Sequence, residues 1–219
     1  MLVCGFTSVI GASSLFAQSY TDNLADLAAN GGTLTIGDKT FSGFTFGDSG
    51  LTSFNASNIQ VTASQVGNSY LLTWGGNISL VSSGTASADL LLNYSVTAND
   101  GKIFAIDQNY TGSADPSGGS FISVTENAFV PGNVVAVASS YLNQMVDSTP
   151  FTATGAVLTP AQPILNVTKD IGFGVVNGGF ITISQVEQSF EQVPVPEPTT
   201  LALAGLSGLS LLLFRRQRK

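Results

Sequence analysis

The chain has 219 residues, of which 43% are hydrophobic and only 10% are charged, whereas an average soluble domain is about 25% charged. Between Gln18 and Val195 three lysines stand against 13 aspartates and glutamates, a net charge of −10, which excludes nucleic-acid binding because that function requires a basic surface. There is no histidine, and the single cysteine is Cys4, so the commonest general base, a thiolate nucleophile and a zinc site are not expected in the mature protein, and we predict neither an enzyme nor a cofactor.

Residues 1–17 have the features of a secretory signal peptide. Residues 2–16 are uncharged and mostly apolar or small, and Ala17 has the position of the last removed residue. No basic residue precedes the run, and a start codon further upstream would explain that. The alternative is that the run forms a buried first strand.

The segment after the signal begins with a short helix and continues as strands. Residues 22–29 have the spacing of an amphipathic helix, with Thr21 or Asp22 as its N-cap. Polar and apolar residues then alternate, which indicates strands. The strands are predicted at residues 33–36, 39–46, 58–63, 69–74, 78–82, 88–98, 103–107, 121–126, 134–139, 164–171 and 179–190.

Turn residues separate these strands. Gly37-Asp38 is a plausible tight turn, and imperfect alternation around Gly43 indicates a bulge. Asn99-Asp100-Gly101 is the strongest hairpin signal in the chain. Many short strands between Gly-, Ser-, Asn- and Pro-rich turns predict an all-β ectodomain over residues 18–192, a β-sandwich or jelly roll.

Aromatic residues in the predicted strands suggest one binding function. Trp74, Tyr94 and Tyr110 would stack on sugar rings if they shared an exposed face. The ectodomain would then be a carbohydrate-binding module for exopolysaccharide. The alternative is that these rings pack in the core, as aromatic residues in strands usually do.

Acidic residues suggest a weak calcium site. Asp100, Asp107 and Asp115 lie around a turn and a Gly- and Ser-rich loop, and Ca²⁺ binds six to eight oxygen ligands. Their spacing matches no EF-hand, and Asp and Asn are also the ordinary residues of turns. Turn formation is the alternative explanation.

Carboxylates would also be required for a hydrolase, the third hypothesis. Glycosidases use two carboxylates on either side of the scissile bond. The candidates are Asp26, Asp89, Glu126 and Glu187. The sequence alone brings no two of them together.

The C-terminus has three parts in a fixed order. Residues 193–198 are Pro-rich and should be an extended spacer. Residues 199–214 are uncharged and predict a separate hydrophobic transmembrane helix, although 16 residues span only about 24 Å, against the roughly 20 residues of a comfortable span. Residues 215–219 form a basic tail that should stay cytoplasmic.

This order resembles the PEP-CTERM sorting signal. The residues that carry the resemblance are Pro196, Glu197 and Pro198, then the hydrophobic run, then Arg215 and Arg216. It implies that the partner is an exosortase, a membrane enzyme that recognises the tail and cuts near the Pro-Glu-Pro motif. The protein would be exported, anchored in the membrane transiently and then moved to the cell surface or extracellular matrix, where its ectodomain would be structural or adhesive.

Overall fold

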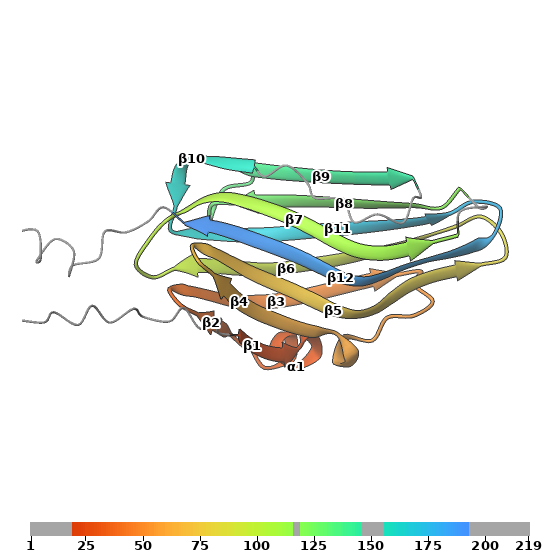
Figure 1. Ribbon diagram of the computed structural model, residues 1–219, viewed down its shortest axis with the longest axis horizontal. Helices are drawn as coiled ribbons and strands as arrows, with labels where there is room; N and C mark the ends of the chain where they lie inside the picture. Colours follow the sequence, from red (N-terminus) through yellow and green to blue (C-terminus); the bar gives the residue numbers. More distant parts are fainter. Residues whose placement is uncertain (1–18, 116–118, 146–155, 193–219) are drawn as a thin grey trace, which may run out of the picture.

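The computed structural model describes residues 19–115, 119–145 and 156–192, with the backbone alone at 140–145. The predicted signal peptide, spacer, hydrophobic helix and basic tail lie outside the described residues. Within them, two six-stranded antiparallel sheets lie face to face as a β-sandwich (Figure 1). The prediction of an all-β sandwich is confirmed for the described residues.

The strands of each sheet come from the whole length of the described chain. The first sheet has the order β1 (Ser19–Asn23), β4 (Gln60–Val66), β5 (Ser69–Ser82), β12 (Gly179–Gln192), β7 (Ile103–Ala114) and β10 (Ala156–Gln162). The second sheet has the order β2 (Leu34–Ile36), β3 (Lys39–Ser49), β6 (Ala86–Ala98), β11 (Ile164–Val175), β8 (Phe121–Phe129) and β9 (Ala138–Met145). Consecutive strands pair with each other in β2–β3, β4–β5 and β8–β9. The chain otherwise crosses between the sheets.

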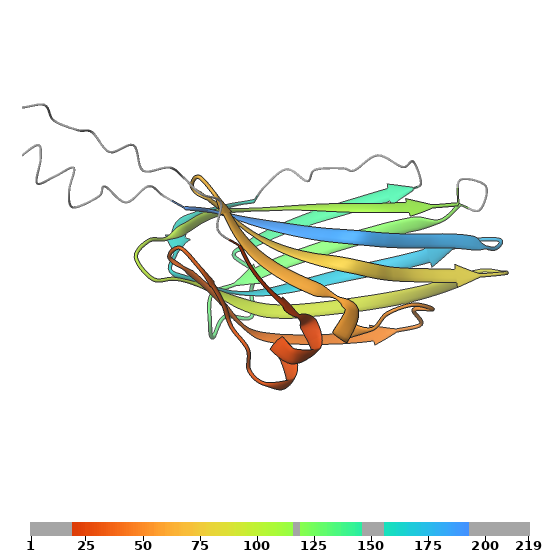
Figure 2. The same cartoon turned by 60° about the horizontal axis from the view of Figure 1, so that its bottom comes forward.

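The helix α1 (Leu24–Ala29) joins β1 to β2 below the sandwich (Figure 2). It begins two residues later than predicted, and its N-cap is Asn23, whose Oδ1 accepts a hydrogen bond from the Asp26 N–H at 2.8 Å. Thr21 and Asp22 are not the cap, because they pair with β4 as part of β1. A 3₁₀ turn, η1 (Ala56–Asn58), precedes β4.

Two of the predicted local features are confirmed. Ile36 pairs with Lys39 across the tight turn at Gly37-Asp38, where Gly37 has a φ of 55°. The register of β3 against β6 shifts between Ser42 and Thr45, which is the bulge predicted near Gly43. The bulge keeps Phe44 directed into the core, with 3% of its surface exposed.

The predicted hairpin at Asn99-Asp100-Gly101 is wrong. The chain does turn there, but β6 belongs to the second sheet and β7 to the first. The turn is held by other segments: the Ala98 N–H bonds to the Pro163 carbonyl at 2.7 Å and the Asn99 N–H to the Asp38 carbonyl at 2.8 Å. Both strands alternate equally well, so each can bury one face in the shared core without pairing with the other.

Other differences concern strand limits. The predicted strands 69–74 and 78–82 are one strand, β5, whose break in pattern at Gly75 lies opposite a register shift in β12. The predicted strand 134–139 is a loop at its start, where Val134 and Val135 are 93% and 74% exposed, and β9 begins at Ala138. The short edge strand β1 and the edge strand β10 were not predicted.

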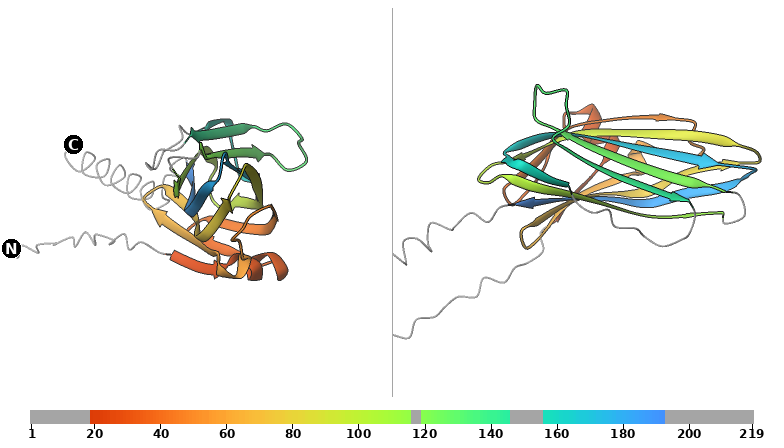
Figure 3. Two further views of the ribbon diagram at one scale, coloured as in Figure 1. Left: turned by 90° about the vertical axis from the view of Figure 1, so that its right-hand side faces the viewer. Right: turned by 90° about the horizontal axis from the view of Figure 1, so that it is seen from above.

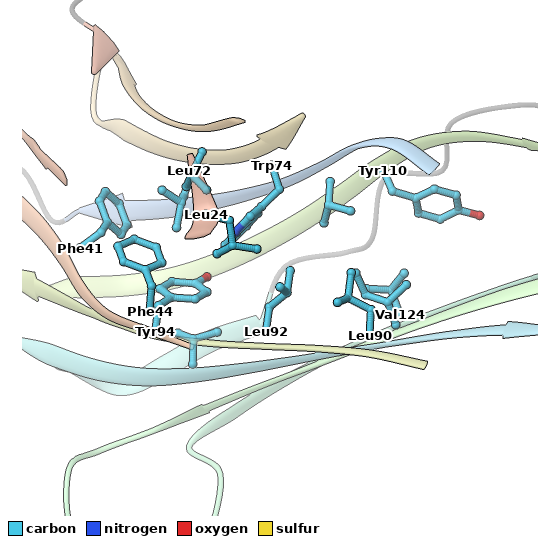
Figure 4. Packing of buried hydrophobic residues seen from close by; sticks show 14 of the residues in the cluster. Leu24, Phe41, Phe44, Leu72, Trp74, Leu90, Leu92, Tyr94, Tyr110 and Val124 are labelled. Atoms are coloured by element: carbon cyan, nitrogen blue, oxygen red, sulfur yellow. The ribbon is translucent and has the colours of Figure 1, made fainter. Parts of the chain in front are cut away.

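The core is centred on Tyr94, which contacts aromatic rings from both sheets (Figure 4). Its ring centroid lies 5.3 Å from Trp74 of β5 and 6.3 Å from Phe190 of β12, both in the first sheet. Within the second sheet it stacks on Phe44 at 6.0 Å. Such aromatic pairs contribute stability beyond the area they bury.

A polar cluster also lies in the core between the sheets. Lys169 of β11 and Glu126 of β8 are fully buried and form an ion pair with an Nζ–Oε2 distance of 2.6 Å. Lys169 Nζ also donates to Gln108 Oε1 of β7 at 2.7 Å and to Gln188 Oε1 of β12 at 3.1 Å. Burial is the main influence on the pair: it raises the pKa of Glu126 and lowers the pKa of Lys169.

Replacing Glu126 with Gln should destabilise the domain by about 3–5 kcal/mol, because the charge of Lys169 would remain buried without its counterion. Chemical denaturation at neutral pH measures this. The double variant Glu126→Leu with Lys169→Met removes both charges and should recover much of the loss. Equal stability of Glu126→Gln and the native protein would contradict a buried charged pair.

Candidate functional site

The predicted stacking platform is wrong. Trp74, Tyr94 and Tyr110 are only 1%, 2% and 5% exposed, and all three point between the sheets (Figure 4). Their strands alternate as predicted, but the aromatic positions fall on the inward face of each strand. No sugar ring can reach their faces, so the alternative interpretation, core packing, is the correct one.

The weak calcium site is also wrong as a cluster. Asp100 lies in the turn before β7, Asp107 in the middle of β7 and Asp115 beyond its end. Eight residues of strand separate Asp107 from Asp115, or about 27 Å. Among the residues that the structure describes, no group of three or more His, Cys, Asp or Glu side chains could hold a metal ion.

The carboxylates considered for a hydrolase are dispersed. Glu126 is buried in its ion pair with Lys169. Glu187 lies on β12 of the first sheet, Asp89 on β6 of the second, and Asp26 in α1. Asp89 instead interacts with Asp170, and burial together with this neighbour raises the pKa of Asp89.

The structure shows a different candidate site, a hollow of about 340 Å³ on the outer face of the first sheet. We call it the acidic groove. It crosses β5, β12 and β7, which lie side by side in Figure 1. Register sets its composition: Glu187 pairs with Asn109, and Ser189 pairs with Asp107. The lining residues are Ser69, Leu71, Asp107, Gln108, Asn109, Glu187 and Ser189.

The acidic groove has unused hydrogen-bond acceptors. Oδ1 of Asp107 and Oδ1 of Asn109 are both buried, and neither has a hydrogen-bond partner within the described part of the chain. Burial, and then the charge of Glu191, raises the pKa of Asp107. Glu191 itself accepts a hydrogen bond from Ser69. A ligand with hydroxyl or amine donors would bond to these acceptors only after their side chains turn toward the hollow.

Replacing Asp107 with Asn should stabilise the domain at neutral pH. The folded protein binds the Asp107 proton more tightly than the unfolded chain, so stability falls as the pH rises from the ordinary Asp pKa through the raised one. The amide of the variant carries no charge at any of these pH values, so the substitution removes this loss. Denaturation of both proteins between pH 3 and neutral, in a range set by the ordinary Asp pKa of about 4, measures the difference. If the native protein shows no decline in this interval relative to the variant, the Asp107 carboxylate is not perturbed.

A second hollow, of about 430 Å³, lies where β1 of the first sheet meets β2 of the second. We call it the edge hollow. Tyr20 is 55% exposed and is the most exposed aromatic side chain among the described residues. The lining residues are Tyr20, Thr21, Asp22, Thr33, Leu34 and Thr35. An exposed ring beside hydroxyl groups and a carboxylate is a suitable surface for a sugar.

Sequence reasoning named Asp107 and Glu187 only for other sites, a calcium site and a hydrolase, and did not bring them together. Tyr20 belongs to no motif, and the neighbours of all three residues come from distant parts of the chain. The available signal was the alternation of β7 and β12, which puts Asp107 and Asn109 on one face, and Glu187 and Ser189 on one face. Only the pairing of β7 with β12 shows that these residues lie on the same face of the sheet and that this face is the outer one.

The fold defines the described domain as a β-sandwich, and the C-terminus carries a recognised motif. The PEP-CTERM protein-sorting motif matches residues 194–219, so the chain carries this C-terminal sorting motif. The motif residues Pro196, Glu197, Pro198, Arg215 and Arg216 lie outside the described residues. Within the described residues, no helix is long and apolar enough to cross a membrane.

Three similar solved structures are carbohydrate-binding modules. One, from the β-sandwich superfamily, has 11% sequence identity and a TM-score of 0.35; the match covers 78% of this chain and 60% of that one. TmCBM61 in complex with β-1,4-galactotriose has 7% identity and a TM-score of 0.33, over 66% and 86% of the two chains. The family 11 module of a cellulosomal cellulase of Clostridium thermocellum has 13% identity and a TM-score of 0.24, over 85% and 94%.

All three likenesses are distant, with TM-scores of 0.35 or less. The chain spans 60% of the length of the first of them. No curated protein matches the sequence.

Proposed function

We propose that this protein is exported, processed at its C-terminus by an exosortase and retained at the cell surface or in the extracellular matrix. The observation that carries the proposal is the PEP-CTERM protein-sorting motif at residues 194–219. The hydrophobic run is short for a permanent span, which favours a signal that is recognised and removed. The ectodomain is non-enzymatic and has a structural or adhesive role.

The contacts around Gln192 support removal of the tail without damage to the domain. Gln192 is the last residue of β12 and accepts a hydrogen bond from Lys39 Nζ. Lys39 is buried, lies 2.5 Å from Asp38 Oδ1 and sits 4.2 Å above the Tyr70 ring. Contacts within the domain therefore hold the end of the strand.

The mature protein isolated from its native host should lack residues 201–219. Intact-mass spectrometry of surface-exposed protein measures this. A variant with Glu197→Ala should accumulate with an uncut tail in the membrane fraction. Recovery of Lys219 on surface-exposed native protein would contradict processing and leave a plain anchor.

The second candidate function is binding of exopolysaccharide at the acidic groove. The observation that favours it is the lining of hydroxyl, amide and carboxylate side chains, among them Asp107, Asn109 and Glu187. Polysaccharides carry many hydroxyl donors. The acidic groove contains no exposed aromatic ring, so recognition there would depend on hydrogen bonds, and stacking would require Tyr20 in the edge hollow.

If the acidic groove binds glycan, the double variant Asn109→Ala with Glu187→Gln should retain several-fold less polysaccharide in a pull-down with the host's own matrix. The matched control is Asp170→Asn, which removes a carboxylate from the outer face of the second sheet. Tyr20→Ala separates the two hollows, because only binding at the edge hollow should respond to it. Full binding by the double variant and by Tyr20→Ala would contradict binding of glycan at either hollow. Turnover of a glycan would contradict the non-enzymatic role.

A further inference from the structure

One end of the sandwich, which we call the exit end, carries the point where the chain leaves for its sorting tail. β12 finishes there at Gln192, whose N–H bonds to the Asn68 carbonyl at 3.4 Å and which pairs with Ile103. The turns 37–38, 67–68, 99–102 and 162–163 meet at this end, as their mutual hydrogen bonds and pairings show. Figure 3 shows the loop 130–137, between β8 and β9, standing out beside it.

The exit end also gathers the most exposed aliphatic side chains. Among the described large hydrophobic residues, four are more than 60% exposed, namely Val66, Val134, Val135 and Val157. Val66 borders the turn 67–68, Val157 pairs with Ala105 close to the end of β12, and the other two lie in the loop. Val66 of β4 and Val157 of β10 are not neighbours, because β5, β12 and β7 lie between their strands. The four valines therefore share one end of the sandwich without forming one continuous patch.

The turns of the exit end carry little net charge on a strongly acidic domain. Their charged residues are Asp38, which pairs with Lys39 of β3, Asp100 and Lys102, and Glu191 of β12 lies one residue before Gln192. Lys102 is the exposed lysine of the described chain, since Lys39 and Lys169 are buried. At the opposite end the described residues present Asp48 and Asp115 and no lysine. A negatively charged surface would therefore repel the exit end least.

The length of the spacer places this end close to whatever holds the tail. Six residues, 193–198, separate Gln192 from the start of the hydrophobic run, and they reach at most about 20 Å when extended. A tether of this length raises the effective concentration of the two partners to the millimolar range, so that even a weak contact is populated.

We propose that the exit end rests on the bilayer while the tail is still attached, with the four valines in contact with lipid and Lys102 near the phosphates. This proposal depends on the proposed function, in which the tail is a temporary membrane anchor. The bilayer contact holds the domain upright over its own tail. It ends when the tail is cut, because the tether that keeps the contact populated is then lost.

The test uses the full chain with Cys4→Ser and one new cysteine, at Val134→Cys on the exit end or at Val81→Cys on the opposite end, where Val81 is 55% exposed. Each protein is labelled with an environment-sensitive fluorophore and reconstituted into phosphatidylcholine vesicles that contain a nitroxide-labelled lipid. We expect several-fold stronger quenching at position 134 than at position 81. Equal quenching at the two positions would overturn the proposal.

Flotation of the vesicles separates failure of the contact from failure of the anchor. A chain that stops after Gln192 keeps residues 1–18 but lacks the tail. If the full chain floats with the vesicles and this shorter chain does not, the tail is the membrane anchor. A full chain that floats with position 134 unquenched overturns the contact alone, whereas a full chain that does not float overturns the anchor and the contact together. Val134→Asp with Val135→Asp should float normally but reduce quenching of a probe at Val66→Cys; unchanged quenching would count against the contact.

Discussion

The packing of Tyr94 against rings from both sheets is the interaction on which the rest of the molecule depends. Its neighbours Phe44, Trp74 and Phe190 arrive from three different strands, and together they close the gap between the sheets. Most of the large rings are used in the core, and the exposed aromatic side chains of the described residues are Tyr20, Phe46, Phe121 and Phe180. None of these four lines the acidic groove, so a ligand there would be recognised mainly by hydrogen bonds.

The same core also determines the charge of the surface. Lys169 is buried in its ion pair with Glu126, and Lys39 is buried in contact with Asp38 and Tyr70. Two of the three lysines in the described chain are thus buried, each beside an acidic partner, and Lys102 is the exposed lysine of the described residues. Lys169 also reaches Gln108, whose strand neighbours Asp107 and Asn109 form one wall of the acidic groove. Polar side chains of β7 therefore face both the core and the outer surface.

The two ends of the sandwich carry different side chains, and the described chain leaves for the sorting tail at the exit end. Gln192 is fixed by Lys39 at the exit end, so the sorting tail starts from a defined point on the domain. The exposed valines and the turns of low net charge are found at this end. Under the proposed anchoring, the exit end is the end that would lie next to the membrane, and the acidic residues Asp48 and Asp115 lie at the opposite end.

The local features of this protein were predictable from its sequence, but the pairing of its strands was not. Alternation predicted the strands, Gly43 the bulge, and the Pro196-Glu197-Pro198 tail the sorting motif, because each depends on neighbouring residues alone. Alternation divided β6 and β7 into two faces, but it could not say which face was inside, so Tyr94 and Tyr110 were open to two interpretations. The turn at Asn99-Asp100-Gly101 serves a hairpin and a crossover equally well. Only the tertiary structure decided that β7 pairs with β12, and this choice alone brings Asp107 and Glu187 together, since contacts between distant segments depend on the packing of the whole core.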